Sequence, residues 1–189
     1  MHTTGLLLAA GAGRRMGTPK ALVSDDHGPW LTRAVHLLDD GGCDDVVVVL
    51  GASAPEAVRL LQVLEDTAGV EVVLADRWEE GMGASLDAGL AALDAGPAQA
   101  ALVSLVDLPD LLPEVVRRVR AGGDGPAALA RASYDGVPGH PVLIGREHWA
   151  GVRASAVGDQ GARDYLATRS VRLVECGDLA SGDDVDTPR

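Results

Sequence analysis

The run LLLAAGAGRRMGTPK, residues 6–20, joins an apolar strand directly to a glycine-rich loop. Three glycines fall within seven residues of this loop: Gly11, Gly13 and Gly17. Glycine lets the backbone approach a ligand closely and turn its N–H groups inward. The loop also carries three basic residues: Arg14, Arg15 and Lys20. A plain glycine-rich turn does not usually need three cations, so the run predicts a phosphate-binding nest at the end of a strand.

Outward from this loop, apolar runs alternate with helical patterns. Seven segments predict strands: residues 4–9, 45–50, 70–74, 101–106, 127–131, 141–144 and 171–175. Helices are expected between them, and this alternation predicts a mostly parallel sheet with helices on both faces. The fold class is therefore α/β, in a single domain over residues 1–189. Ligands of such sheets bind outside the carboxyl ends of the strands.

Three helices have clear signals. Ser53 and Glu56 have the spacing of a capping box, and Pro55 suits the first turn of the helix that follows. Its apolar face is supplied by three leucines: Leu60, Leu61 and Leu64. A second helix is predicted over residues 85–95 from leucines at helical spacing, and a third opens at Pro113.

Composition limits the functions that remain. A formal charge of −12 gives no basic footprint for nucleic acid or for an anionic membrane. No apolar stretch approaches the roughly 20 residues of a membrane span, and the start of the chain lacks the pattern of a signal peptide. Cys43 and Cys176 are isolated, which favours small buried side chains in a reducing cytosol. We therefore expect a cytoplasmic protein that binds anions through a local cluster of donors.

Lys20 is the only lysine among 16 basic residues, and the other 15 are arginines. The two side chains are not interchangeable where a compact ammonium must reach between phosphate oxygens. Chance is the alternative, since a single lysine must fall somewhere. Its place in the glycine-rich loop favours a chemical requirement for the ammonium group.

Two common phosphate loops do not fit the sequence. A Walker A loop needs Gly-Lys followed by Ser or Thr, and no such run occurs. A dinucleotide fingerprint needs a third glycine where Met16 stands, and an acid at the end of the second strand, which instead ends Leu50-Gly51-Ala52.

Polar residues follow two further strands. Asp107 comes directly after the strand at residues 101–106, where a hard carboxylate suits Mg²⁺ and a helix-entry Asp is the plainer interpretation. Gly81, Met82, Gly83 and Ser85 follow the strand at residues 70–74. The glycines allow close approach to a flat base, while Ser85 is equally suited to cap the next helix. The tail at residues 181–188 holds three acids, which near a terminus are most simply solvated charge.

The run from Leu8 to Lys20 resembles the signature of the MobA-like NTP transferases. The resemblance implies a Rossmann-like, three-layer sandwich of the GT-A type found in nucleotide-diphospho-sugar transferases. It also implies a nucleoside triphosphate held by the loop backbone, with Arg14, Lys20 and Asp107 as catalytic residues. The nucleotide-binding residues it implies are Ala9, Ala10, Gly11, Ala12, Gly13, Arg14, Lys20, Gly81, Met82, Gly83 and Ser85.

The same resemblance extends beyond the loop. The run Asp107-Leu108-Pro109 is similar to the family's metal-binding motif, and the tail resembles an Asp-x-Asp-Thr-Pro segment, which implies Mg²⁺ ligands at Asp107 and Asp186. Gly139-His140-Pro141 is similar to an acceptor-side segment, although a lone histidine is more often a structural hydrogen bonder. Residues 158–163 resemble a further family segment with no chemistry assigned.

The details of these segments point to one branch of the family. Ala10-Gly11 replaces the two glycines of guanylyl-transferring members and resembles the cytidylyl-transferring ones. The implied reaction moves CMP from CTP to the phosphate of molybdopterin, with Mg²⁺ as cofactor and a molybdoenzyme or its chaperone as a partner. Alternatives are an NAD(P)H-dependent oxidoreductase of the nicotine-blue type, a non-catalytic carrier of molybdenum cofactor, and a sugar-phosphate nucleotidyltransferase.

Overall fold

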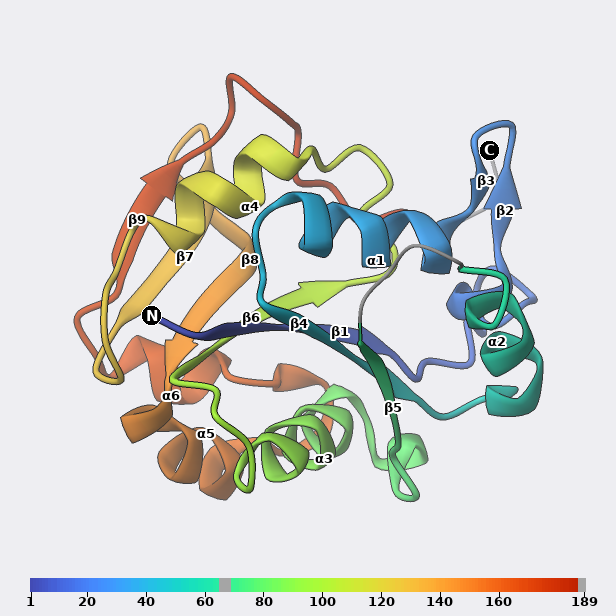
Figure 1. The fold of residues 1–189 in the computed structure, drawn as a ribbon, viewed down its shortest axis with the longest axis horizontal. Coiled ribbons are helices and arrows are strands. Elements are labelled where there is room, and N and C mark those ends of the chain that lie inside the picture. The colour runs from blue at the N-terminus through green and yellow to red at the C-terminus, as the bar shows by residue number, and fades with distance from the viewer. Residues whose placement is uncertain (65–68, 187–189) are drawn as a thin grey trace.

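Seven strands form one sheet between two layers of helices (Figure 1). The computed structural model describes residues 1–64 and 69–186. The strands are β1 Thr3–Ala9, β4 Asp45–Leu50, β5 Val70–Leu74, β6 Ala100–Leu105, β7 Leu129–Tyr134, β8 Val137–Gly145 and β9 Arg172–Glu175. They lie in the order β5-β4-β1-β6-β8-β7-β9, and a two-stranded hairpin, β2 Ser24–Asp25 with β3 Gly28–Pro29, stands apart. The predicted α/β class and mostly parallel sheet are confirmed.

The reversed strand is β8, which pairs antiparallel with both β6 and β7. Its direction follows from a tight turn at Asp135-Gly136, where both residues have positive φ, 51° and 80°. Asp-Gly with two positive φ values is the turn that suits a β-hairpin. The strand predicted at residues 127–131 therefore begins and ends too early, and the strand predicted at residues 141–144 is too short, because β7 and β8 run on to this turn.

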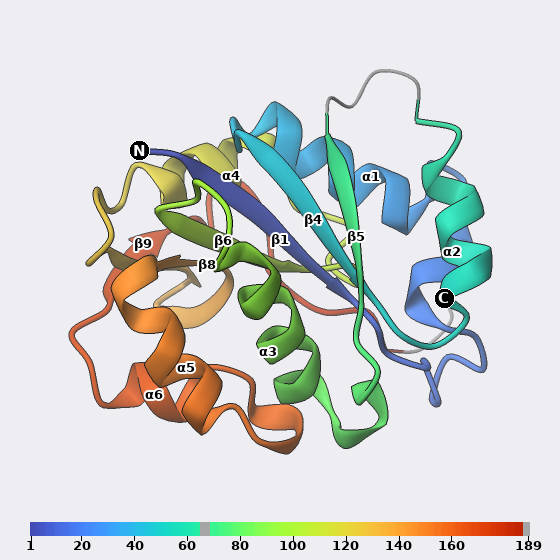
Figure 2. The ribbon, with the colours of Figure 1, turned by 60° about the horizontal axis from the view of Figure 1, so that its bottom comes forward.

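The helices divide between the two faces of the sheet (Figures 1 and 2). One layer contains α1 Trp30–Asp40, α2 Ala54–Leu61 and α4 Pro113–Arg120. The other contains α3 Met82–Leu93, α5 Trp149–Ser155 and α6 Arg163–Ala167. In β1, Leu7 and Ala9 face the first layer while Leu6 and Leu8 face the second. Successive strand side chains point to opposite faces, so a strand covered on both faces reads as a continuous apolar run.

Two predicted helix starts need correction. Ser53 does precede α2, but it adopts left-handed φ of 54° and its side chain makes no capping hydrogen bond to the described residues. The helix ends at Leu61, so Leu64 packs on the core from the segment after it. The helix predicted at residues 85–95 begins earlier, at Met82. Ser85 is therefore buried inside α3 and does not cap it.

Glu175, at the end of β9, makes hydrogen bonds to β7, to the β7–β8 turn and to the segment after β9. Its carboxylate accepts hydrogen bonds from the amides of Asp135 (2.9 Å), Gly136 (3.1 Å) and Gly177 (2.9 Å), and from Ser133 Oγ (2.8 Å). These donors, led by the Gly177 amide and the Ser133 hydroxyl, lower the pKa of Glu175 to about 2 from its usual 4.5. The ionised carboxylate thus holds the β7–β8 turn against β9.

We expect Glu175→Gln to lower the melting temperature at pH 7. A lowered folded-state pKa contributes stability above the ordinary value of 4.5, and this is lost as the pH falls toward 2. The difference from wild type should therefore shrink steadily below pH 4.5 in thermal unfolding. Glu147→Gln, at an exposed glutamate outside this network, is the control. Equal melting temperatures at pH 7, or a difference that stays constant into acid, would contradict the assignment.

No helix of the described residues is long and apolar enough to cross a bilayer.

Candidate functional site

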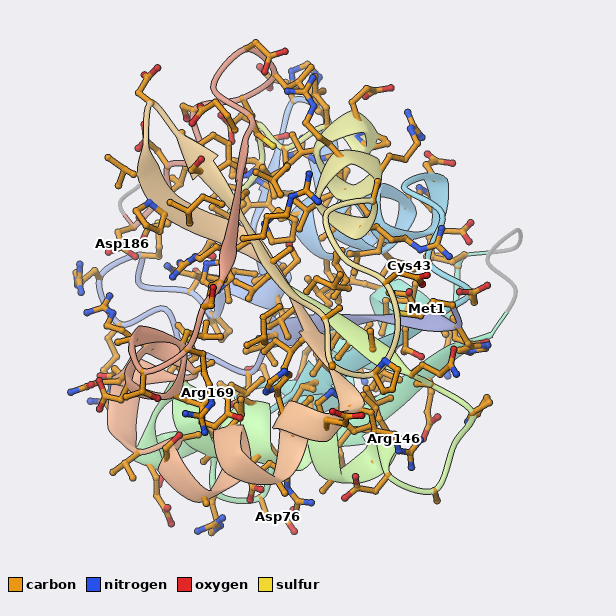
Figure 3. The ribbon with its side chains drawn as sticks, turned by 90° about the vertical axis from the view of Figure 1, so that its left-hand side faces the viewer. Met1, Cys43, Asp76, Arg146, Arg169 and Asp186 are labelled. Carbon is orange, nitrogen blue, oxygen red and sulfur yellow. The ribbon has the colours of Figure 1, made fainter. Side chains whose placement is uncertain are left out.

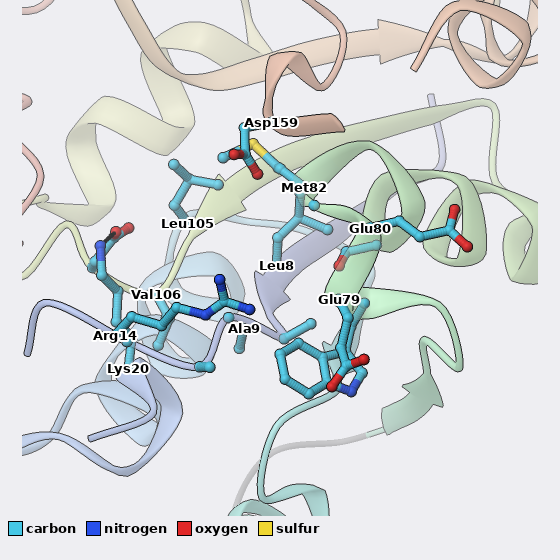
Figure 4. Close-up of a pocket in the computed structure, with 18 residues that line it drawn as sticks. Leu8, Ala9, Arg14, Lys20, Glu79, Glu80, Met82, Leu105, Val106 and Asp159 are labelled. Atoms are coloured by element: carbon cyan, nitrogen blue, oxygen red, sulfur yellow. Dashed lines mark hydrogen bonds and ion pairs between the residues drawn. The ribbon is translucent and has the colours of Figure 1, made fainter. Parts of the chain in front are cut away.

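The glycine-rich loop lies at the carboxyl end of β1 and borders a cavity of about 360 Å³ (Figure 4). Gly13 has φ of 58°, and a Cβ there would lie 1.9 Å from the carbonyl oxygen of Thr18. Only glycine fits this turn, which folds the loop back on itself. The cavity falls within the roughly 300–1,000 Å³ that is usual for small-molecule sites.

Most of the nucleotide-binding residues implied by the sequence meet at this cavity. Those that line it are Ala9, Ala10, Gly11, Ala12, Gly13, Arg14, Lys20, Gly81, Met82 and Ser85. Gly83 does not, because it is buried against the segment after α5, where a Cβ would lie 2.7 Å from the backbone of Ala156. The structure therefore brings together the loop after β1 and the start of α3, which are about sixty residues apart in the chain.

Trp78 was not predicted as a site residue. It lines the cavity from the turn before α3 and packs against Gly51, where a Cβ would lie 2.4 Å from its Cγ. The end of β4, where a dinucleotide fold carries an acid, is thus covered by an indole ring. A large, flat apolar side chain beside the loop is a surface on which a planar ring can stack. The sequence held a signal for this contact. Trp78 comes shortly after the strand β5, and Gly51 comes directly after the neighbouring strand β4.

Lys20 lies between two carboxylates. Its ammonium group donates to Asp107 Oδ2 and to Asp186 Oδ1, the latter at 2.5 Å. Burial by itself lowers the pKa of Lys20, but the hydrogen bonds to Asp107 and Asp186 outweigh it and the pKa is raised. The hydrogen bond from Lys20 in turn lowers the pKa of Asp186. The ammonium of Lys20 and the two carboxylates stand together at the carboxyl ends of β1 and β6.

The two loop arginines take different places. Arg14, which the resemblance implied as a nucleotide contact, is exposed and lines the cavity. Arg15 is one of the three cations from which the phosphate-binding loop was predicted, and it forms an ion pair with Asp186.

The tail returns to the carboxyl end of the sheet, on the opposite side of the molecule from Met1 and Cys43 (Figure 3). The Val185 amide donates to the Asp107 carbonyl at 3.0 Å and anchors this return. Three carboxylates then gather: Asp107, Asp184 and Asp186 each offer one oxygen within 4.8 Å of the others. Thr187, Pro188 and Arg189 lie outside the described residues, and Asp184 is an addition to the two predicted ligands.

Hard carboxylate oxygens are the ligands that Mg²⁺ and Mn²⁺ prefer. The buried position of Asp107 and the close approach of three acids fit a divalent cation. An uncompensated acidic cluster is costly, and Lys20 and Arg15 supply its positive charge here. The donor set therefore suits a divalent metal ion.

His140 lies at the same edge of the sheet because β8 runs against its neighbours. Val142 pairs with Val103, so His140, two residues earlier, lies toward the carboxyl end of β6. It lines a second cavity of about 120 Å³, which shares Leu8, Met82 and Asp159 with the first. Burial, with the positive charge of Arg131, lowers the pKa of His140 to about 4, so the imidazole is neutral at pH 7.

Known proteins resemble this chain over most of its length. The MobA-like NTP transferase domain matches residues 5–174. The nicotine blue oxidoreductase of Paenarthrobacter nicotinovorans is 38% identical over 194 residues, covering 97% of this chain and 92% of the relative.

Solved structures share the fold. Rv0371c from Mycobacterium tuberculosis has a TM-score of 0.78 at 30% identity, covering 99% of this chain and 94% of the other. A complex of Rv0371c with manganese has a TM-score of 0.74 at 27% identity, covering 98% and 94%. A nucleotidyl transferase from Methanothermobacter, at 21% identity, has a TM-score of 0.81 and covers 98% and 92%.

Proposed function

The chain belongs to the MobA-like NTP transferase family, and we propose that it is a magnesium-dependent nucleotidyltransferase that moves CMP from CTP to the phosphate of a molybdopterin-type acceptor. The observation that carries the proposal is the Lys20 ammonium, held by Asp107 and Asp186 beside the glycine-rich cavity. A triphosphate in that cavity would meet loop amides and a fixed positive charge. Such preorganised charge is what transfer at phosphorus requires.

The chain's residues divide the work as follows. Amides of the loop at residues 9–13 hold the phosphates, while Arg14 and Lys20 neutralise charge on the α-phosphate and the departing pyrophosphate. A phosphate oxygen of the acceptor attacks the α-phosphorus, and the bond from that phosphorus to the bridging oxygen of pyrophosphate breaks. The nucleophile is already ionised, since the second pKa of a phosphate monoester is about 6. No general base is needed, and His140, with a pKa of about 4, would be too weak a base to take that role, which leaves it to position the acceptor.

Asp107, Asp184 and Asp186 would hold the metal. When bound, Mg²⁺ supplies charge neutralisation for the triphosphate oxygens. The manganese complex of Rv0371c supports a divalent ion in this fold.

Two features support a pyrimidine nucleotide. Ala10 carries a Cβ where a second glycine would leave more room, and Trp78 covers the neighbouring wall of the cavity. Both narrow the space for a base. The product would pass to a molybdoenzyme or its chaperone, and the buried free thiols of Cys43 and Cys176 suit a reducing cytoplasm.

An NAD(P)H-dependent oxidoreductase is the second candidate, and the 38% identity with nicotine blue oxidoreductase favours it. The cavity is large enough for part of a dinucleotide. Hydride transfer, however, gives no role to the cluster of Asp107, Asp184, Asp186 and Lys20. A molybdenum-cofactor carrier and a sugar-phosphate nucleotidyltransferase share the same cavity and differ in turnover and in acceptor.

Melting temperatures measured with CTP, GTP, ATP, UTP and NADPH, each with and without Mg²⁺, test the proposal. A ligand at 100 times its dissociation constant adds about 2.7 kcal/mol to stability. We expect the largest shift with CTP and Mg²⁺ together, and Asp107→Asn should remove the magnesium-dependent part. Pyrophosphate release with molybdopterin as acceptor should then follow.

Other outcomes separate the alternatives. A shift with NADPH alone would replace the transferase by the oxidoreductase. Cofactor binding without pyrophosphate release would indicate a carrier. Pyrophosphate release with a sugar phosphate, and none with molybdopterin, would show that the acceptor is a sugar phosphate.

A further inference from the structure

The second cavity contains two arginines whose charge the protein does not neutralise. Arg131 of β7 and Arg163 at the start of α6 both line it, together with His140. Neither guanidinium forms an ion pair with a carboxylate among residues 1–64 and 69–186. Most other arginines of the described chain are paired with acids or stacked on aromatic rings. In a protein of charge −12, two adjacent unpaired cations in a cavity need an explanation.

Arg131 is fixed in place without being neutralised. Its Nε and Nη2 both donate to the Gly139 carbonyl, at 3.3 and 3.1 Å. The Tyr134 hydroxyl donates to the next carbonyl, that of His140, at 2.6 Å. Burial and the nearby charge of Arg163 lower the pKa of Arg131, although it stays protonated at neutral pH. The fold therefore keeps a positioned charge beside a second one, at a cost that a bound anion would offset.

The apolar lining of the second cavity strengthens the attraction of Arg131 and Arg163 for an anion. Apolar side chains form the floor of the cavity: Leu86, Val103, Val142, Ile144 and Leu166. Electrostatic attraction is stronger beside such a low-dielectric wall than in water. Asp159 is the carboxylate that also lines the cavity, at its boundary with the nucleotide cavity and near Met82 (Figure 4). It pairs with neither arginine, so the net charge facing the cavity remains positive.

We propose that Arg131 and Arg163 form an anion subsite that binds the phosphate monoester of the acceptor. The inference rests on the proposed function and names the residues that select its second substrate. At about 120 Å³, a third of the first cavity's 360 Å³, the space suits one phosphate group and not a second nucleotide. Because the two cavities share Leu8, Met82 and Asp159, a phosphate held there lies next to the nucleotide.

Binding of inorganic phosphate, followed by calorimetry, tests the subsite without any turnover. The glycine-rich loop also attracts phosphate, so the measurement is made in a Lys20→Met background. We expect phosphate to bind this variant and Arg163→Gln in the same background to weaken binding about 10-fold or more, as for a lost charge-assisted hydrogen bond. Arg163 is exposed, so its replacement should leave the fold intact. Arg169→Gln is the control, since Arg169 lies outside the cavity and stacks on Tyr165.

A kinetic arm links the subsite to the reaction. In otherwise wild-type protein, Arg163→Gln should raise KM for the phosphorylated acceptor about 10-fold or more. The KM for CTP and the CTP-induced melting shift should not change. Arg131→Gln should act in the same direction, with circular dichroism as the check on its folding.

The two proposals fail in different ways. Phosphate binding that Arg163→Gln does not weaken would overturn the subsite, whatever the enzyme does with CTP. Binding that Arg163→Gln weakens, in a protein that releases no pyrophosphate with any nucleotide, would keep the anion subsite and overturn the transferase.

Discussion

Lys20→Met is expected to reduce pyrophosphate release by about 10³-fold or more. Methionine keeps much of the side-chain volume and removes the ammonium that joins Asp107 to Asp186. Loss of one preorganised donor at a developing charge costs roughly 10²–10³-fold, and a cation at a transferred phosphoryl group costs more. Because the two carboxylates lose their internal cation, the melting temperature of this variant should also depend more strongly on Mg²⁺ than that of wild type.

Two further variants sharpen this test. Lys20→Arg should fail to restore turnover, because a planar guanidinium cannot replace a compact ammonium between two carboxylates and a phosphate. Arg33→Met removes a paired cation from α1, where Arg33 bridges to Asp25 away from the cavity, and should keep full activity. If Lys20→Met retained its turnover, the lysine would be a structural link between the tail and the sheet, and the mechanism would need another source of positive charge.

Gly13→Ala is expected to abolish binding of CTP while the core stays folded. The new Cβ would lie 1.9 Å from the Thr18 carbonyl oxygen, and φ of 58° is unfavourable for any residue with a side chain. The loop must therefore open, and its amides can no longer converge on one phosphate. The loop is mostly exposed, so circular dichroism of the variant should match wild type. The measurement is the CTP-induced melting shift, which should vanish.

Gly125→Ala is the matched control. Gly125 also has positive φ, 80°, but a Cβ there has open space around it and the position lies away from the cavity. It should cost roughly 1–2 kcal/mol of stability through backbone strain and leave the CTP shift unchanged. A Gly13→Ala protein that binds CTP as wild type does would show that the loop conformation is not needed for nucleotide binding.

The sequence predicted the strands better than the helices, for physical reasons. The central strands are covered on both faces, so each reads as a short apolar run that ends where burial ends, as residues 45–50 show. Helix α1 was not predicted, although Leu31, Val35 and Leu38 recur at helical spacing on its buried face. Helices α5 and α6 span seven and five residues, too few for a periodic pattern to stand out.

The part of the site built from residues adjacent in the chain could be predicted from the sequence. The parts built from residues that only the fold brings together were harder to predict. The loop at residues 11–20 carries its own signal, because its glycines and cations are adjacent in the chain. The tail could be linked to Asp107 only through resemblance to a family, since nothing in the spacing brings Asp186 to Lys20. Arg131, His140 and Arg163 meet because β8 reverses at Asp135-Gly136. The Asp-Gly pair between the two predicted strands is a hairpin signal that was present in the sequence and was not used.

The reversal of β8 also separates the origins of the two cavities along the chain. Apart from Asp159, the walls of the first cavity come from residues 8–107, whereas the polar side chains of the second come from residues 131–163. Changes in residues 131–163 can therefore alter the second cavity while the lining of the first, apart from Asp159, stays the same. Proteins of this fold can therefore differ in their second cavity while they keep the first, as expected when one fold hosts many functions.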